Sequence, residues 1–182
     1  MSIDPLGQAL LILARNAIEG EFGRPARAAA PLAELAAPGA AFVTLTQNGN
    51  LRGCIGSLEA WRPLAEDVAA NARAAAFRDP RFPALRREEL EATRVEVSLL
   101  DAPEPMHFTD EADALAQLRP NVDGLILSRG SRRATFLPQV WESLATPRAF
   151  MEHLKLKAGL PANFWSADVK LARYGVRKWK EE

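Results

Sequence analysis

The stretch AFVTLTQNGNLRGCIGS, residues 41–57, carries the strongest local structural signal in this chain of 182 residues. Two strand-like runs flank the dipeptide formed by Asn48 and Gly49, which tolerates the positive φ that a two-residue hairpin turn requires. We therefore predict an antiparallel hairpin with its tip at these two residues.

The position of the turn predicts a register for the two strands. Counting back from the tip pairs Leu45 with Arg52 and Val43 with Cys54, and period-two alternation puts these side chains on one face. The opposite face then carries Phe42, Leu51 and Ile55. In this register Arg52 and Cys54 lie on the same face, roughly 7 Å apart along the strand.

Outside the hairpin, apolar residues at helical or alternating spacing predict the other elements. We expect helices over residues 5–20, 63–77, 88–91, 110–118 and 146–159, and strands over 94–100, 125–127, 134–137 and 173–176. This mixture predicts a fold of the α+β or α/β class, with a mainly antiparallel sheet flanked by helices. Pro103 and Pro105 predict a stiff connection between two lobes of a single domain.

The composition is that of an ordinary globular protein. Hydrophobic residues make up 48% and charged residues 25% of the chain, which excludes wholesale disorder, a collagen helix and a disulfide scaffold. Because 23 Lys and Arg balance 23 Asp and Glu, no overall basic excess favours nucleic-acid binding. The longest aliphatic run, residues 9–14, is too short to span a membrane, and no secretory signal is recognisable. The one cysteine points to a reducing compartment, so we expect a cytoplasmic protein.

Cys54 is the first candidate for chemistry. Gly53 precedes it and Gly56 follows two residues later, and glycine inside a strand indicates a bulge or a close approach by another backbone or a ligand. A guanidinium at Arg52 would favour the reactive thiolate form of the cysteine. The alternative is a small buried residue packed beside Val43, as unreactive cysteines commonly are.

Histidine, the usual base for a nucleophilic cysteine, is poorly represented. His107 and His153 are the two in the chain, and neither has local features that would orient it. The sequence also has no recurring zinc-ligand spacing and neither of the glycine-rich phosphate-binding motifs, so no metal is predicted and the cofactor stays unknown.

Three charged residues remain as candidates. Asp79 and Arg81 stand in a proline-bounded loop, where they either bind substrate or bridge to each other. Glu96 lies on a strand beside Ser98, on a solvated face or, if it is covered, next to a partner such as Arg52 or Arg81. We predict a catalytic group of Cys54, Arg52 and Glu96, and substrate contacts from Gly53, Gly56, Asp79 and Arg81.

Several separated motifs resemble one known family. They are LRGCIGSLE (51–59), AFRDPRFPAL (76–85), VEVSLL (95–100), DGLILSRGSRRATFLPQVWE (123–142) and LKAGLPANFW (156–165). In this order they resemble the AMMECR-type domain, also called protein A of the AmmeMemoRadiSam system, from about Leu10 to the C-terminus. The family motifs carry over to Arg52, Gly53, Cys54, Gly56, Asp79, Arg81, Phe82, Glu96, Phe136, Leu137 and Pro138. Ala84 stands where a second proline is common.

The resemblance implies an α/β domain of two unequal lobes with a cleft between them. The larger lobe is expected over about 1–103 plus 160–182, and the smaller over about 104–159. The family supplies no established reaction. In many prokaryotes its members look associated with a Memo-like protein and a radical-SAM protein, which implies these two as partners.

Two hypotheses about function follow. In the first, the protein is a thiol-dependent enzyme in which Cys54 is the nucleophile or covalent carrier, Arg52 activates it or holds an anion, and Glu96 or Asp79 moves a proton. In the second, it is a non-catalytic adaptor or small-molecule-binding component that works with the Memo-like and radical-SAM proteins. Nucleic-acid binding is the least supported reading.

Overall fold

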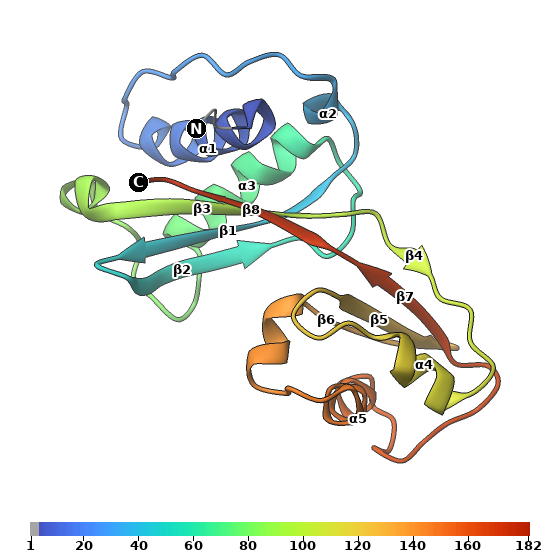
Figure 1. The fold of residues 1–182 in the computed structure, drawn as a ribbon. Helices are drawn as coiled ribbons and strands as arrows, with labels where there is room; N and C mark the ends of the chain where they lie inside the picture. Colours follow the sequence, from blue (N-terminus) through green and yellow to red (C-terminus); the bar gives the residue numbers. More distant parts are fainter. Residues whose placement is uncertain (1–3) are drawn as a thin grey trace. The chain divides into compact units, whose positions relative to one another are not determined.

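The computed structural model describes residues 4–182. The chain divides into two compact units, one made of the part up to Leu100 together with Arg177–Glu182, and the other of Asp101–Val176. Each unit has a four-stranded sheet and its own cluster of buried apolar side chains (Figure 1). The predicted class is confirmed: helices combine with mainly antiparallel sheets in an α+β fold.

The first unit is built on a sheet with the strand order β2-β1-β3-β8. Its strands are β1 (Ala40–Gln47), β2 (Asn50–Gly56), β3 (Thr93–Leu100) and β8 (Val176–Lys180). Its helices are α1 (Pro5–Gly20), α2 (Ala33–Ala36), α3 (Leu64–Phe77) and the short 3-10 helix η1 (Arg87–Ala92). Strand β1 runs antiparallel to both β2 and β3, and β2 forms one edge of the sheet.

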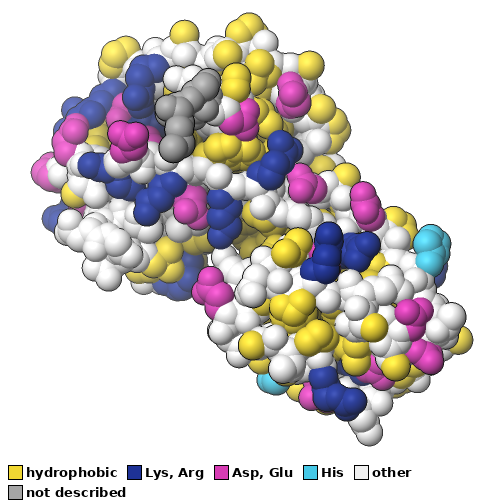
Figure 2. Space-filling view, viewed as in Figure 1, with side chains coloured by type: hydrophobic (Ala, Val, Ile, Leu, Met, Phe, Trp, Pro, Cys, Tyr) yellow, Lys and Arg dark blue, Asp and Glu magenta, His cyan; other side chains and the backbone are white. Residues whose placement is uncertain are grey.

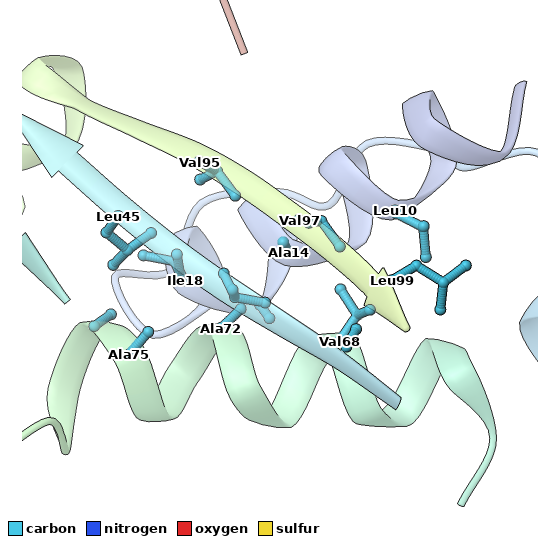
Figure 3. Close-up of a cluster of buried hydrophobic side chains, with 14 of the residues drawn as sticks. Leu10, Ala14, Ile18, Leu45, Val68, Ala72, Ala75, Val95, Val97 and Leu99 are labelled. Atoms are coloured by element: carbon cyan, nitrogen blue, oxygen red, sulfur yellow. The ribbon is translucent and has the colours of Figure 1, made fainter. Parts of the chain in front are cut away.

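Helices α1 and α3 cover one face of this sheet. Asp4 caps α1 by accepting a hydrogen bond from the Leu6 N–H, and Pro5 suits the first turn because no N–H is needed there. The buried side chains of both helices meet those of β1 and β3 in one core, which includes Leu10, Ile18, Val68, Ala72, Leu45, Val95 and Val97 (Figure 3). Strand residues alternate between faces, so the neighbours of these buried residues lie on the face that α1 and α3 do not cover.

The hairpin forms as predicted, but its register differs. Asn48 and Gly49 make the turn with φ values of 50° and 79°. A β-bulge then leaves Arg52 as the extra residue of β2, so that Cys54 pairs with Thr44. The predicted pairs Leu45 with Arg52 and Val43 with Cys54 are therefore wrong by one residue. The observed pairs are Thr46 with Leu51, Leu45 with Gly53, Thr44 with Cys54, Val43 with Ile55 and Phe42 with Gly56.

The second unit is built on a sheet with the order β4-β7-β5-β6. Its strands are β4 (Glu104–Pro105), β5 (Gly124–Arg129), β6 (Arg132–Phe136) and β7 (Lys170–Tyr174). Its helices are α4 (Glu111–Gln117), α5 (Pro147–Lys157) and the 3-10 helix η2 (Pro138–Glu142). In its core the rings of Trp141 and Phe150 stack with centroids 3.9 Å apart, and the Trp141 indole donates to the Asp123 carbonyl.

The division of the chain differs from the expected lobes at its second boundary. We expected residues 160–182 in the larger lobe, but β7 pairs with β5 and so belongs to the second unit. The two ends of the second unit meet, because the Asp101 N–H donates to the Gly175 carbonyl at 2.9 Å. The second unit is thus a continuous insertion into the chain of the first.

The surface carries charges of both signs. On the face shown in Figure 2, basic and acidic side chains are intermingled and form no block of a single sign. None of the helices in residues 4–182 combines the length and the apolar composition needed to cross a membrane.

Candidate functional site

Three half-buried side chains form a row across β2, β1 and β3, on the face of the sheet opposite α1 and α3. Thr44 pairs with Cys54 on one side and with Glu96 on the other. The Thr44 hydroxyl and the Cys54 thiol share a hydrogen bond of 3.3 Å. Neighbouring strands are about 5 Å apart, so the backbone of Glu96 lies roughly 10 Å from that of Cys54, with Thr44 between them. The row brings together a thiol, a hydroxyl and a carboxylate.

Cys54 is partly exposed and lies outside both clusters of buried apolar side chains. The alternative of a buried cysteine packed beside Val43 is wrong, because the bulge turns Cys54 to the opposite face. The side chain of Glu96 has no hydrogen-bond or ion-pair partner among the residues that the structure describes. Its expected partners, Arg52 and Arg81, pair with other carboxylates.

Asp79 and Arg81 hold the main chain of Cys54. In the observed register the N–H and C=O of Cys54 point away from β1, toward the free edge of the sheet. The Cys54 N–H donates to Asp79 Oδ2 at 2.9 Å, and Arg81 Nη2 donates to the Cys54 carbonyl at 3.2 Å. The two side chains also pair with each other, with Arg81 Nε 3.0 Å from Oδ1 and Nη2 2.7 Å from Oδ2 of Asp79. We call these two residues the edge clamp.

The edge clamp is a permanently charged pair. The hydrogen bonds from Arg81 and from the Cys54 amide hold the pKa of Asp79 well below its usual range, although burial opposes this. The hydrogen bond with Asp79 in turn raises the pKa of Arg81. A carboxylate that stays ionised in this way is a weak base, which argues against Asp79 as a proton carrier.

Arg52 lies away from the thiol. Its side chain is buried and makes a two-point ion pair with Glu89 of η1, at 3.0 and 3.1 Å. Gln47 joins this group by donating to Glu89 and to Thr93, and Gln47 and Thr93 belong to the helix-covered face by alternation. The expectation that Arg52 activates Cys54 from the same face is therefore corrected. Its role is to neutralise Glu89, whose pKa this hydrogen bond lowers to about 2.

The two glycines of the motif mark close approaches within the chain. A Cβ at Gly53 would lie 2.1 Å from the backbone oxygen of Ala75 in α3, and one at Gly56 would lie 2.2 Å from the ring of Phe42. Gly53 thus lets α3 pack directly against β2, and Gly56 makes room for Phe42 beside the row. The prediction was a bulge or a close approach: the bulge lies beside Gly53, which the backbone of α3 approaches, and a side chain approaches Gly56. Substrate contact by these glycines stays a prediction.

The family model described as AMMECR1 matches residues 11–179. The chain belongs to the AMMECR1 family. A crystal structure of the uncharacterized protein PH0010 from Pyrococcus horikoshii is similar to this AMMECR1-family chain with a TM-score of 0.80 and 33% identity. That comparison covers 99% of this chain and 93% of the other.

Two curated relatives extend the family likeness. A protein from Methanothermobacter thermautotrophicus is 40% identical over 147 residues, which cover 78% of this AMMECR1-family chain and 74% of the relative. Protein MK0488 from Methanopyrus kandleri is 35% identical over 187 residues, covering 97% and 88% of the two chains. The names of these two relatives state no reaction.

Sequence reasoning missed Thr44 in this AMMECR1-family protein. A threonine on an alternating strand gives no signal of its own, and the expected register placed Val43 rather than Thr44 opposite the cysteine. Both histidines lie in the second unit, and the ring of His153 bonds the Ala149 carbonyl of its own helix. No cluster of three or more His, Cys, Asp or Glu side chains within residues 4–182 is arranged to hold a metal ion.

Proposed function

We propose that this AMMECR1-family protein is a thiol-dependent enzyme whose nucleophile or covalent carrier is Cys54. The observation that carries the proposal is the row of Cys54, Thr44 and Glu96 on the face of the first sheet opposite α1 and α3. The edge clamp supports the proposal further, because its two hydrogen bonds fix the backbone of Cys54.

The row can move one proton away from the sulfur. When substrate binds, the Glu96 carboxylate, which has no partner among the described residues, turns to accept from the Thr44 hydroxyl while the Thr44 oxygen accepts from the Cys54 thiol. The proton thereby passes to Glu96 and leaves a thiolate at Cys54. The sulfur then forms a bond to an electrophilic carbon of the substrate. As the bond from that carbon to its leaving group breaks, Glu96 returns the proton to the leaving group. In this scheme Glu96 replaces the histidine base of other cysteine enzymes.

The pH dependence of alkylation tests this proposal. Cys54 is the single cysteine, so incorporation of iodoacetamide measured by intact mass reports this thiol alone. We expect the native protein to react at a lower pH than the same protein unfolded in urea, because Thr44 and Glu96 accept the thiol proton as the sulfur attacks. A native thiol that reacts no faster than the unfolded one at every pH would overturn the enzyme proposal and favour the adaptor hypothesis.

Two variants test whether Thr44 and Glu96 form the proton path. Thr44→Val and Glu96→Gln should each move the pH profile of alkylation toward that of the unfolded protein. Thr44→Ser keeps the hydroxyl and should keep the wild-type profile. Thr46→Val is the matched control, because Thr46 lies on the same strand and face but pairs with Leu51 rather than with the cysteine. Equal shifts in Thr46→Val and Thr44→Val would show that the row has no special part.

A further inference from the structure

Arg81 presents a fixed cationic group next to the candidate nucleophile. Its Nε and Nη2 are held by Asp79, and Nη2 also reaches the Cys54 carbonyl. A planar guanidinium held at these points cannot rotate freely, so the direction of its remaining donors is set by the fold. The Arg81 guanidinium is therefore held in one orientation before any ligand binds.

The pair of Asp79 and Arg81 shows its positive end to solvent. The Arg81 side chain is 54% exposed, whereas that of Asp79 is 2% exposed. The negative charge thus lies behind the positive one, and an approaching ligand meets the guanidinium first. The Arg81 guanidinium also lies 5.5 Å from the ring of Phe82, which further limits its motion.

Arginine in such a setting is suited to bind an oxyanion. Its Nη1 carries two N–H donors that make no hydrogen bond with any described residue, and donors that are already immobilised lose little entropy on binding an oxygen of a carboxylate or phosphate. Arg52, which sequence reasoning assigned to hold an anion, is committed to Glu89 on the other face. Glu96 carries the opposite charge and lies beyond Thr44 on the far side of the thiol from the sheet edge.

We propose that Arg81 binds an oxyanion group of the substrate, so that the site takes a small electrophile bearing a carboxylate or a phosphate. This inference rests on the proposed function and names its substrate class. The anionic group lies over Arg81 at the edge of β2, and the electrophilic carbon lies over Cys54. Asp79 acts as a positioning residue, because it holds both the guanidinium and the Cys54 amide.

A matched pair of alkylating reagents tests this charge preference. Iodoacetate carries a carboxylate and iodoacetamide a neutral amide; with both, the thiolate sulfur forms a bond to the CH₂ carbon and iodide leaves. The ratio of the two rates for the native protein, divided by the same ratio for the unfolded protein, measures the selectivity of the site. We expect a value of about 5 at low salt, falling toward 1 as salt screens the exposed guanidinium.

Variants locate the source of the selectivity. Arg81→Gln should bring the ratio to about 1 without slowing the neutral reagent to the same extent, which a purely structural loss would do. If this change unfolds the protein by leaving Asp79 buried and unpaired, the double variant Asp79→Asn with Arg81→Gln supplies a neutral pair of similar size. Arg27→Gln, which removes one exposed arginine elsewhere in the first unit, should keep the wild-type ratio.

Competition then separates the two oxyanions. Inorganic phosphate and acetate, compared at equal ionic strength, should slow iodoacetate more in the wild type than in Arg81→Gln, and the more effective one identifies the group that the site prefers. A wild-type ratio of 1 or below, or one that Arg81→Gln leaves unchanged, overturns the inference.

Both rates are measured at pH 9, where any accessible thiol reacts, so the ratio does not depend on unusual reactivity of Cys54. Failure of the proposed function would appear in the pH profile, whereas failure of this inference would appear in the ratio alone.

Discussion

At the scale of single residues, one inserted residue decides what the cysteine can do. Arg52 occupies the bulge of β2, and this shifts Cys54 from the helix-covered face to the opposite one. The bulge also sends the Arg52 guanidinium to Glu89, where the two charges are buried together. The same residue thus stabilises the first unit and sets the orientation of the thiol.

The pair of Arg52 and Glu89 should make stability depend on pH. The pKa of Glu89 is lowered from 4.5 to about 2, so its ionised form stabilises the folded state above about pH 4.5. This contribution is lost as the pH falls through 2. We expect Glu89→Gln to lower the free energy of unfolding at pH 7 by about 3 kcal/mol. Arg52 Nη1 already lacks a partner among the described residues, which adds to the cost of removing the carboxylate.

Urea unfolding at pH 7, 4 and 2.5 checks this expectation. The difference between wild type and Glu89→Gln should shrink as the pH falls, because the wild type loses the same interaction by protonation. Glu88→Gln is the control, since Glu88 is an exposed neighbour in the same short helix. Stability curves for wild type and Glu89→Gln that stay parallel from pH 7 to 2.5 would contradict the assignment.

At the scale of elements, β2 is an edge strand, and two side chains form hydrogen bonds with its otherwise unpaired backbone groups at Cys54. Edge strands expose unpaired N–H and C=O groups that invite association with other strands. At Cys54 the carboxylate of Asp79 and the guanidinium of Arg81 take the places of a neighbouring strand's carbonyl and amide. At this one residue, side chains from the loop after α3 therefore form the hydrogen bonds that a further strand would form.

Hydrogen exchange should report this arrangement directly. In the wild type the Cys54 amide is protected by its bond to Asp79, although it lies on the free side of β2. We expect Asp79→Ala to raise the exchange rate of the Cys54 amide at least tenfold, which corresponds to a loss of about 1.4 kcal/mol of local protection. Amide-resolved exchange by NMR provides the measurement.

The Gly53 amide serves as the internal control for this experiment. Gly53 pairs with Leu45 inside the sheet, so its exchange should change little in Asp79→Ala. If both amides accelerate equally, the variant has loosened the whole hairpin, and Asp79→Asn then gives the gentler test. An unchanged Cys54 rate in both variants would refute the edge clamp as the source of protection.

The elements were largely predictable from the sequence, whereas the site was predictable only in part. The Asn48 and Gly49 turn, α1 and α3 follow from local signals such as positive φ, caps and apolar spacing. The register beyond the turn does not follow from local signals, because the bulge lies beside a tertiary contact, the close approach of Gly53 to the backbone of Ala75. The pairing of Asp79 with Arg81 was one of the two alternatives predicted and is observed, whereas the neighbours of Cys54 and Glu96 depended on that register.

At the scale of the whole molecule, the chain builds two units with separate cores. The motifs of the sequence indicated the AMMECR-type family over nearly the full length, and the family match over residues 11–179 confirms it. The proline-rich connection at 103–105 lies close to the first boundary at Leu100. The second boundary was misplaced, because no proline or glycine cluster separates β7 from β8 and only strand pairing reveals it.

The second unit should fold when it is produced alone. Residues 101–176 are continuous, contain their own sheet and bury Trp141 against Phe150. We expect a cooperative thermal transition of this fragment with near-UV circular dichroism from Trp141. The Trp141→Phe fragment is the control for the assignment of that signal. A fragment with a broad, non-cooperative transition would show that its core is insufficient without the rest of the chain.

The hydrogen bond between Asp101 and Gly175 brings together the two points at which the inserted segment leaves and re-enters its host. A module whose ends meet can be exchanged for a short linker without stretching the strands on either side. During evolution such a segment is free to acquire a new binding surface, or to disappear, while the thiol-bearing sheet keeps its connectivity. Relatives that differ mainly between these two points would therefore keep the first unit, with its row of Cys54, Thr44 and Glu96, and differ in the surface of the second.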